Sequence, residues 1–213
     1  MTGNESGYHE IADTIRERIC LAPIDDPFVL REPVLAEEFG ISRTPIRQIL
    51  QRLAFDKMVE TRPGIGTIAK RLDPKRRAHA FAVYNQLASA AAACSEGDPL
   101  PDWIKVELIG LANLVIEQSE HTPESYIRYS KQIVSAMALS ADDDILSSAL
   151  TAAHWRVLRW RVQDMRATPE FSWQGFKDNM ERIAKAVSTS DRAVFLRTVA
   201  GVVERQMLST AAE

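Results

Sequence analysis

The sequence predicts a mainly α-helical protein in two parts: an N-terminal winged helix-turn-helix (three helices plus a β-hairpin) and a C-terminal antiparallel bundle of six helices. Residues 8–71 combine three helical patterns with one hairpin pattern, and we assign them to the first domain. Residues 72–77 form a linker and helix start, and residues 78–211 carry only helical patterns. With 46% apolar residues, the chain can bury a substantial core.

In the first domain, a long helix is expected from Tyr8 to Cys20, because Ile11, Ile15 and Ile19 share one face. A short helix follows over residues 32–39. These two helices precede the segment that carries the most information about function.

The third helix is predicted from its end signals and its apolar spacing. Gly40 can end the preceding helix in a left-handed conformation, and Ser42 is a suitable N-cap whose hydroxyl can accept a bond from a free amide. Pro45 fits in the first turn. Apolar residues then recur at i, i+3, i+4 and i+7 and predict one buried face: Ile46, Ile49, Leu50 and Leu53.

The polar face of this helix carries the candidate DNA contacts. Arg43, Arg47 and Gln51 recur every four residues, with Thr44 and Gln48 beside them. Arginine can bind guanine or phosphate and glutamine can bind adenine, so the face is typical of a recognition helix. By periodicity alone, a solvated basic face fits equally well.

A β-hairpin is predicted over residues 57–70, with its turn at residues 63–66. Gly64 and Gly66 would let the backbone approach DNA closely, although an ordinary hairpin turn also uses such glycines. Arg31 and Arg62 complete the predicted DNA-binding set.

The distribution of charge agrees with this placement. The chain carries a net charge of −3, whereas residues 38–77 carry +6 and the remainder −9. The positive charge is therefore concentrated where phosphates would lie.

The second domain is predicted to begin at Pro74, with Asp73 as its cap. Three consecutive aspartates, residues 142–144, stand at a helix start, where they favourably oppose the helix dipole. The predicted helices cover residues 74–95, 101–118, 122–139, 143–166, 172–188 and 191–210.

Several classes of protein are not supported by the sequence. No apolar run approaches the roughly 20 residues of a membrane span, and the N-terminus has no apolar signal core. We interpret Cys20 and Cys94 as buried, reduced thiols and expect a cytoplasmic protein. Common hydrolase, nucleotide-binding and zinc-protease motifs are missing, so we do not expect an enzyme.

The segment Ser42-Arg43-Thr44-Pro45-Ile46-Arg47, with Leu35-Ala36 before it and Pro63-Gly64 after it, resembles the GntR family of bacterial transcription regulators. The resemblance covers residues 8–70. It implies DNA contacts from Arg43, Thr44 and Arg47 on the recognition helix and from Gly64 and Gly66 in the wing.

Three positions depart from the family pattern. Gln48 stands where a glutamate is usual, and Asp56-Lys57-Met58 replaces a usual glycine. Pro33 stands where some relatives use a DNA-contacting arginine, a role that Arg31 would have to take.

The second part resembles the ligand-sensing FCD domain of the FadR subfamily, in its VanR-like six-helix form. Many such domains bind a divalent metal through one aspartate and three histidines, and the metal holds a carboxylate ligand. The corresponding positions here are Tyr126, Ser130, Met180 and Val202, which are poor ligands for a hard metal. We therefore expect no metal cofactor.

The candidate effector-binding residues are Tyr126, Ser130, His154, Arg161 and Met180. His154 and Arg161 lie two helical turns apart, and Arg161 could bind a carboxylate. A structural histidine or a solvated basic face is the alternative. Aromatic residues could line an effector pocket, the core or a dimer seam: Tyr126, Tyr129, Trp155, Trp160, Phe171, Trp173 and Phe176.

The sequence thus predicts a homodimeric regulator, by resemblance a repressor, that binds a palindromic operator in double-stranded DNA. A small-molecule effector, with organic acids among the candidates, would modulate its operator affinity. Two alternatives remain: a helical small-molecule enzyme with a vestigial DNA domain, and an architectural DNA-binding or partner-sensing protein.

Overall fold

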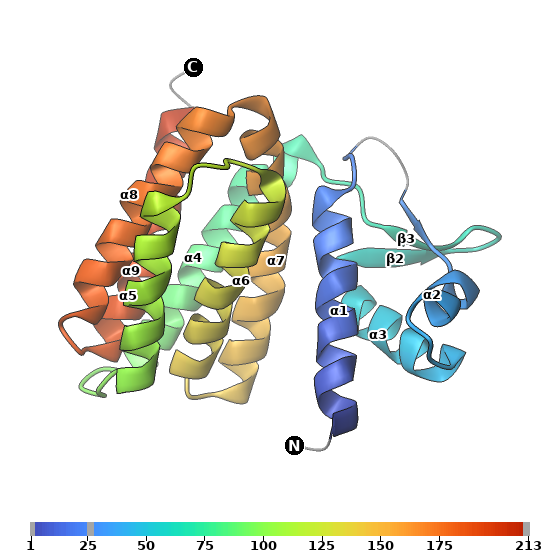
Figure 1. Ribbon diagram of the computed structural model, residues 1–213, viewed down its shortest axis with the longest axis horizontal. Helices are drawn as coiled ribbons and strands as arrows, with labels where there is room; N and C mark the ends of the chain where they lie inside the picture. Colours follow the sequence, from blue (N-terminus) through green and yellow to red (C-terminus); the bar gives the residue numbers. More distant parts are fainter. Residues whose placement is uncertain (1–2, 25–27, 211–213) are drawn as a thin grey trace. The chain divides into compact units, whose positions relative to one another are not determined.

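The computed structural model describes residues 3–24 and 28–210. The chain divides into two compact units, Met1–Pro74 and Lys75–Glu213 (Figure 1). The first combines helices with a small antiparallel sheet, and the second is helical, so the predicted fold class is confirmed.

The first unit is a three-helix, three-stranded winged fold. The sheet has the order β1-β3-β2, with both pairings antiparallel. Its described elements are α1 (Gly3–Leu21), β1 (Val29–Leu30), α2 (Glu32–Glu38), α3 (Arg43–Phe55), β2 (Val59–Arg62) and β3 (Gly66–Ala69).

Two features of this unit differ from the sequence prediction. Helix α1 begins at Gly3 rather than Tyr8, because its first turn carries no apolar periodicity to mark it. Strand β1 was not predicted: two residues, Val29 and Leu30, are too short a run to show alternation, and their pairing with β3 is long-range.

The core of the first unit is formed by the predicted apolar face of α3 against α1 and the sheet. Its fully or nearly fully buried side chains are Ile15, Ile19, Ile46, Ile49, Leu53, Met58 and Ile68. Burial of each such side chain contributes about 1.5–3 kcal/mol, so this face fixes the orientation of α3.

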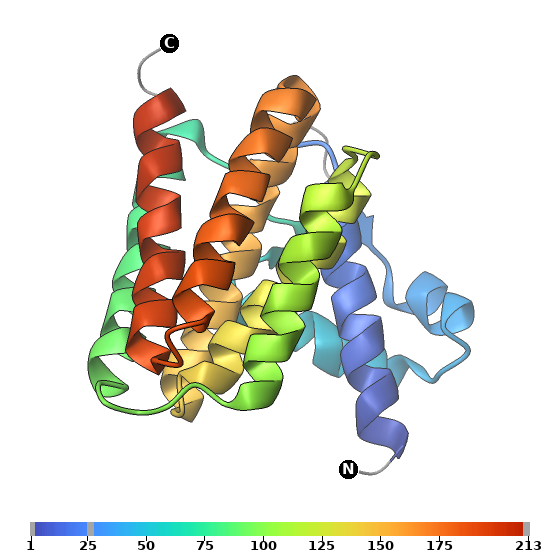
Figure 2. The same cartoon turned by 60° about the vertical axis from the view of Figure 1, so that its left-hand side comes forward.

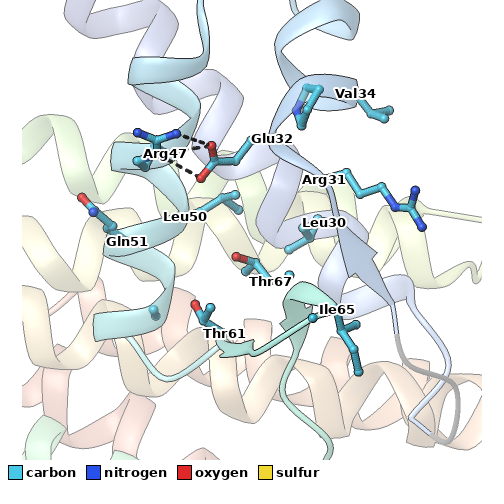
Figure 3. Close-up of a pocket in the computed structure, with 14 residues that line it drawn as sticks. Leu30, Arg31, Glu32, Val34, Arg47, Leu50, Gln51, Thr61, Ile65 and Thr67 are labelled. Carbon is cyan, nitrogen blue, oxygen red and sulfur yellow. Dashed lines mark hydrogen bonds and ion pairs between the residues drawn. The ribbon is translucent and has the colours of Figure 1, made fainter.

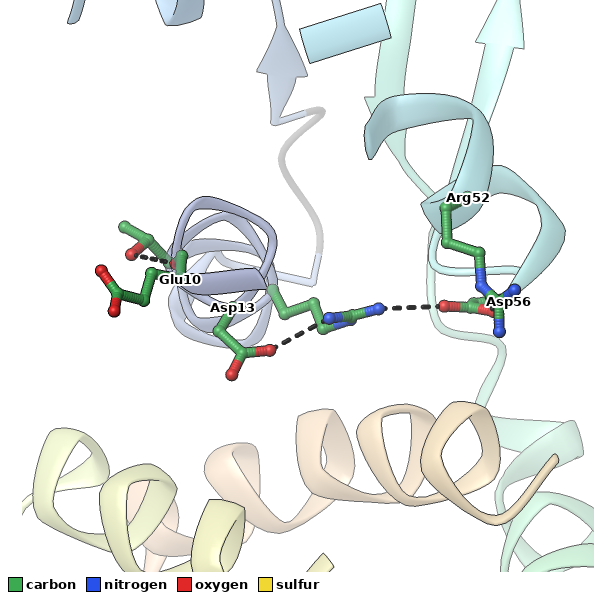
Figure 4. A network of polar contacts seen from close by, with 6 residues as sticks. Glu10, Asp13, Arg52 and Asp56 are labelled. Atoms are coloured by element: carbon green, nitrogen blue, oxygen red, sulfur yellow. Dashed lines mark hydrogen bonds and ion pairs between the residues drawn. The ribbon is translucent and has the colours of Figure 1, made fainter. Parts of the chain in front are cut away.

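Ion pairs add a second connection between α1 and the end of α3 (Figure 4). The Nη2 of Arg16 lies 3.3 Å from Oδ2 of the buried Asp56, and its Nη1 donates to Oδ1 of Asp13 at 3.0 Å. Arg52 Nε lies 3.3 Å from Oδ1 of the same Asp56. The buried carboxylate is therefore held by two guanidinium groups.

The turn before α3 follows the prediction in its backbone but not in its cap. Gly40 has a φ of 64°, and Ile41 N donates to Ala36 O at 3.0 Å, which ends α2. Ser42 occupies the N-cap position, yet its side chain makes no capping bond. The amide that an N-cap most often satisfies is missing here, because Pro45 stands at the third helical position.

The turn after α3 places Lys57 in the left-handed region, with a φ of 62°. The prediction that a strand begins at Lys57 is wrong, and β2 begins at Val59. Residue 57 lies within the segment where the resembling family usually has a glycine. A side chain in this conformation costs about 1–2 kcal/mol relative to the right-handed one.

The second unit consists, over its described residues, of six helices that run side by side in both views (Figures 1 and 2). A single 3₁₀ turn, Pro74–Arg76, precedes them. The helices are α4 (Arg77–Cys94), α5 (Asp102–Glu117), α6 (Pro123–Ser140), α7 (Asp144–Ala167), α8 (Pro169–Val187) and α9 (Arg192–Thr210).

Two predicted helix starts in this unit are wrong. The first α-helix begins at Arg77 rather than Pro74, because the residues between them form the 3₁₀ turn. Helix α8 begins at Pro169 rather than at residue 172, since proline is well suited to the first position of a helix. Asp143 behaves as a cap, and its Oδ1 accepts a bond from Leu146 N at 2.8 Å.

One prediction of burial is also wrong. Cys94, at the last position of α4, is exposed, whereas Cys20 is buried as expected. Phe171 is 61% exposed, while the other six members of the aromatic set are buried. In the part of the chain that the structure describes, no helix is long and apolar enough to cross a membrane.

Candidate DNA-binding face and interior polar cluster

Helix α3 presents its predicted polar residues on the surface. Arg43, Thr44, Arg47, Gln48 and Gln51 are all exposed, opposite the buried isoleucine and leucine face. The solvated face of α3 is thus rich in hydrogen-bond donors. Whether it binds DNA stays a prediction.

A groove of about 800 Å³ lies between the start of α2, the middle of α3 and the tip of the β2–β3 hairpin (Figure 3). Five of the predicted DNA-binding residues line it, whereas Arg43, Thr44, Gln48 and Arg62 do not. The five that line the groove are Arg31, Arg47, Gln51, Gly64 and Gly66.

An ion pair crosses the groove between α2 and α3. The Nη2 of Arg47 lies 2.9 Å from Oε2 of Glu32, and its Nε lies 3.2 Å from both carboxylate oxygens. These bonds lower the pKa of Glu32, against a smaller opposing effect of burial. In Figure 3 the Glu32 side chain points toward Arg47, whereas Arg31 points away from the pair.

Glu32 is a residue that the sequence reasoning missed. It stands 15 residues before Arg47 on another helix, so no local spacing could connect them. The arginine that we predict to contact DNA is therefore held by an acidic partner in the free protein.

The two glycines of the hairpin tip have backbone conformations that other residues rarely adopt. Gly64 has a φ of 76° and Gly66 a φ of 108°, and a Cβ on either would meet nothing within 4 Å. Backbone conformation rather than space therefore requires glycine at both positions. Ile65 between them is 55% exposed. Arg62, at the end of β2, donates a hydrogen bond from Nε to Oε1 of Glu60 at 2.8 Å.

A second polar site lies inside the helical unit, between α4, α6 and α7. The Tyr84 hydroxyl lies 3.1 Å from Met137 Sδ and 3.3 Å from His154 Nδ1, and all three residues are buried. Arg161 lies on the same face of α7 as His154, two turns further on, with its Cζ 5.9 Å from the centre of the Phe81 ring.

The interior changes the ionisation of these groups. Burial, with a smaller contribution from the positive charge of Arg161, lowers the pKa of His154 to about 3. Burial raises the pKa of Tyr84 to about 12. Both residues are therefore neutral at physiological pH, and Arg161 supplies the positive charge near them.

Several polar atoms of this cluster have no hydrogen-bond partner. They are Nε2 of His154, Oγ of Ser130 and both Nε and Nη2 of Arg161. His154 and Ser130 are 2% and 1% exposed, so water does not readily compensate them. An unsatisfied buried polar group costs about 1–3 kcal/mol, which makes such a concentration unusual.

Four of the five predicted effector-binding residues belong to this region. The charge of Arg161 acts on Tyr84, Tyr126 and His154, and Ser130 follows Tyr126 by one turn of α6. The fifth, Met180, is fully buried on α8 one turn from Phe176, whose ring centre lies 4.6 Å from that of Tyr126. Of the two alternatives for His154, a solvated basic face is wrong, because His154 is buried, whereas a structural histidine remains open.

The residues at this site do not fit a divalent metal. Of the four positions that correspond to the metal ligands of the resembling family, Tyr126, Ser130 and Met180 are buried but offer a phenol, a hydroxyl and a thioether. The side chain of Val202 lies outside the described residues. No group of three His, Cys, Asp or Glu side chains suited to a metal occurs among the described residues.

Comparison with known proteins shows what the first unit is similar to. Residues 7–68 match the family of bacterial regulatory proteins called gntR. A stretch of 100 residues is 32% identical to an HTH-type transcriptional regulator from an unstable DNA locus of Streptomyces ambofaciens, and covers 46% of this chain and 42% of that protein. A stretch of 69 residues is 38% identical to MngR, the mannosyl-D-glycerate transport/metabolism system repressor of Escherichia coli K12.

The MngR match covers 32% of this chain and 29% of MngR, so the chain spans less than half the length of either curated relative. Two solved structures share the fold over nearly the whole chain. E. coli McbR/YncC has a TM-score of 0.72 at 17% identity, covering 98% of this chain and 97% of its own. A transcriptional regulator GntR from Rhodococcus sp. RHA1 has a TM-score of 0.66 at 14% identity, covering 97% and 98%.

Proposed function

We propose that the chain is a sequence-specific transcriptional regulator acting in the cytoplasm, because residues 7–68 match the gntR family of regulatory proteins. One observation carries the proposal: α3 is fixed in the fold by a fully buried face and turns an arginine- and glutamine-bearing face to solvent beside a glycine-tipped wing. Arginine and glutamine are the side chains that bind guanine and adenine in the major groove.

The proposed DNA-bound form is a homodimer. One recognition helix contacts only a few base pairs, and two helices related by a two-fold axis would bind a palindromic operator. Base contacts are proposed for Arg43, Arg47 and Gln51, with Gly64 and Gly66 allowing the wing backbone to approach the phosphates.

The helical unit is proposed to bind a small-molecule effector that shifts the equilibrium between DNA-binding and non-binding forms. Repression is the proposed output, because the related MngR is a repressor. We propose no catalytic role for either unit.

The proposal is tested by selecting bound sequences from random DNA with the full chain and measuring affinity for the selected operator by fluorescence anisotropy. Arg47→Ala should weaken operator binding by roughly 10- to 100-fold, since one good arginine–guanine contact discriminates by about 1–3 kcal/mol. Binding to unrelated DNA at the same salt concentration should fall much less.

Arg52→Ala is the matched control. It removes the same charge from the same helix, but Arg52 pairs with Asp56 on the side away from the groove, and Asp56 keeps Arg16 as a partner. Circular dichroism should show that both variants are folded. Selection of no sequence, or equal losses in the two variants, would contradict the proposal; an architectural DNA-binding protein would give the first result.

A further inference from the structure

The ion pair between Glu32 and Arg47 uses only part of the arginine. The bonds to Glu32 come from Nε and Nη2, which form one edge of the planar guanidinium group. They take up one N–H of each of these two atoms, whereas a guanidinium group has five N–H donors. The donors outside the pair belong to Nη1 and Nη2, at the end of the fork.

The end of the fork is suited to a guanine base. A guanidinium group binds O6 and N7 of guanine through two parallel N–H bonds, and the two Nη atoms of Arg47 can supply both. Arg47 lines the groove and is exposed, whereas Glu32 is half-buried, so the arginine is the more accessible partner (Figure 3). A guanine can therefore bind without breaking the pair.

The carboxylate that holds Arg47 is attached to a fixed part of the backbone. Glu32 is the first residue of α2, and Pro33 after it has its φ fixed by its ring. In the next turn the buried Leu35 donates from its amide to Arg31 O at 3.0 Å. A free arginine loses much rotamer freedom when it binds a base, and the pair accounts for part of that loss before DNA arrives.

The charge of Glu32 also affects what Arg47 can bind. The hydrogen bond from Arg47 lowers the pKa of Glu32, burial opposes this, and the charges of Arg47 and Arg43 add to it, so the carboxylate is ionised at physiological pH. A phosphate that approaches the paired Arg47 meets a carboxylate of the same sign. Guanine carries no net charge, so the pair favours a base edge over the phosphate backbone.

We infer that Glu32 is a positioning residue for DNA recognition, which stays paired with Arg47 in the operator complex and directs its Nη1–Nη2 edge to one guanine. By its charge, Glu32 also disfavours contact between Arg47 and phosphate. The inference rests on the proposed function. A glutamate can instead accept a bond from N4 of cytosine, but Arg47 already bonds both carboxylate oxygens of Glu32, which favours the positioning role.

Selection of bound sequences from random DNA tests this role with the full chain and its Glu32→Gln, Arg47→Ala and double variants. Glu32→Gln should lower the preference for guanine by at least about fivefold, at the same operator position where Arg47→Ala lowers it. The double variant should resemble Arg47→Ala, because a positioning residue has no effect without the arginine that it positions.

Three results would overturn the inference. The first is a loss of preference in Glu32→Gln at a different base pair, which direct binding of cytosine would give. The second is no loss of preference at any position. The third is a double variant whose losses are the sum of those in the two single variants, since independent residues act additively.

The salt dependence of binding to unrelated DNA tests the repulsion of phosphate and needs no operator. For each bound protomer, Glu32→Gln should steepen the slope of log K against log salt concentration by about 0.9, the value for one additional phosphate contact. Glu37→Gln removes the same charge from α2 outside the groove and should leave the slope nearly unchanged. Circular dichroism should show that all variants are folded.

The two experiments separate this inference from the proposed function. A wild type that selects no sequence contradicts the proposed function, and equal slopes in wild type and Glu32→Gln would then overturn the role of Glu32 as well. A wild type that selects an operator, with a guanine preference that Arg47→Ala removes and Glu32→Gln leaves intact, contradicts the role of Glu32 alone.

Discussion

The two units differ in the surroundings of their charged and polar side chains. In the winged unit, Arg47 is exposed over 60% of its side chain and is paired with Glu32 at the surface. In the helical unit, His154 is buried and Arg161 keeps polar atoms without partners. Water solvates the first arrangement, whereas Nε and Nη2 of Arg161 and Nε2 of His154 are buried without hydrogen-bond partners.

This difference separates two kinds of site. A surface pair can open at small cost when a phosphate or a base replaces one partner. An interior cluster of unsatisfied polar atoms lowers the stability of the unit that holds it. Because it also holds the buried His154, the helical unit should be the more sensitive of the two to pH.

The largest effect is expected from pH acting on His154. Because burial lowers its pKa to about 3, the folded protein leaves it neutral while the unfolded chain, with a pKa near 6.5, takes up a proton. Stability contributed by neutral His154 is present above about pH 6.5 and falls as the pH falls. Between pH 7 and pH 5 the loss should be roughly 2 kcal/mol.

Urea unfolding followed by tryptophan fluorescence measures this loss in the helical unit. His154→Gln cannot titrate, so its free energy of unfolding should depend less on pH than that of the wild type by the same roughly 2 kcal/mol. Parallel pH dependences in the two proteins would show that His154 is not buried as neutral imidazole.

A smaller effect is expected at the turns that follow helices. Lys57 in the winged unit and Ser190 in the helical unit both have left-handed φ values, 62° and 61°. Lys57→Gly should stabilise its unit by about 1 kcal/mol through relief of backbone strain. Ser190→Gly should gain less, because it loses the bond that Lys105 Nζ donates to Ser190 Oγ at 3.0 Å.

Thermal unfolding followed by circular dichroism compares the two variants with the wild type. Equal gains would mean that the Lys105–Ser190 bond contributes nothing. A loss of stability in Lys57→Gly would show that residue 57 does not hold a left-handed conformation in solution.

The smallest effect on stability is expected at the surface pair. Glu32→Gln should leave unfolding nearly unchanged, because exposed ion pairs contribute little. It should nevertheless raise affinity for unrelated DNA by about twofold to tenfold and lower the ratio of operator to non-operator affinity, since Arg47 is then free to bind any phosphate.

Fluorescence anisotropy at two salt concentrations measures both affinities. Glu37→Gln, which removes the same charge from the exposed side of α2 outside the groove, is the matched control. If the two variants change DNA binding equally, the effect is one of net charge, and Glu32 has no specific hold on Arg47.

Much of the fold could be predicted from local patterns. The apolar spacing of Ile46, Ile49, Leu50 and Leu53 gave the buried face of α3, and Gly40 gave the turn before it. The helix start at the three aspartates, residues 142–144, was likewise predicted from their place in the sequence. Each of these features depends on residues within one or two turns of each other.

Most of the features that the sequence did not predict depend on residues that are far apart in the chain. Strand β1 exists because Val29 and Leu30 pair with Ile68 and Thr67, almost 40 residues away. Ser42 is the local exception: it makes no capping bond, and Pro45 removes the amide at the third helical position. The exposure of Cys94 depends on the packing of the last turn of α4, which composition does not reveal.

The sequence by itself determined the helical periods, the turn at Gly40 and the two-faced helix that bears Arg43 and Arg47, because backbone hydrogen bonds and side-chain spacing act over a few residues. Only the tertiary structure decided that Glu32 pairs with Arg47. It also decided that polar atoms of Ser130, His154 and Arg161 lie buried in the helical unit without hydrogen-bond partners. Those contacts join different helices, and their existence depends on how the helices pack and exclude water.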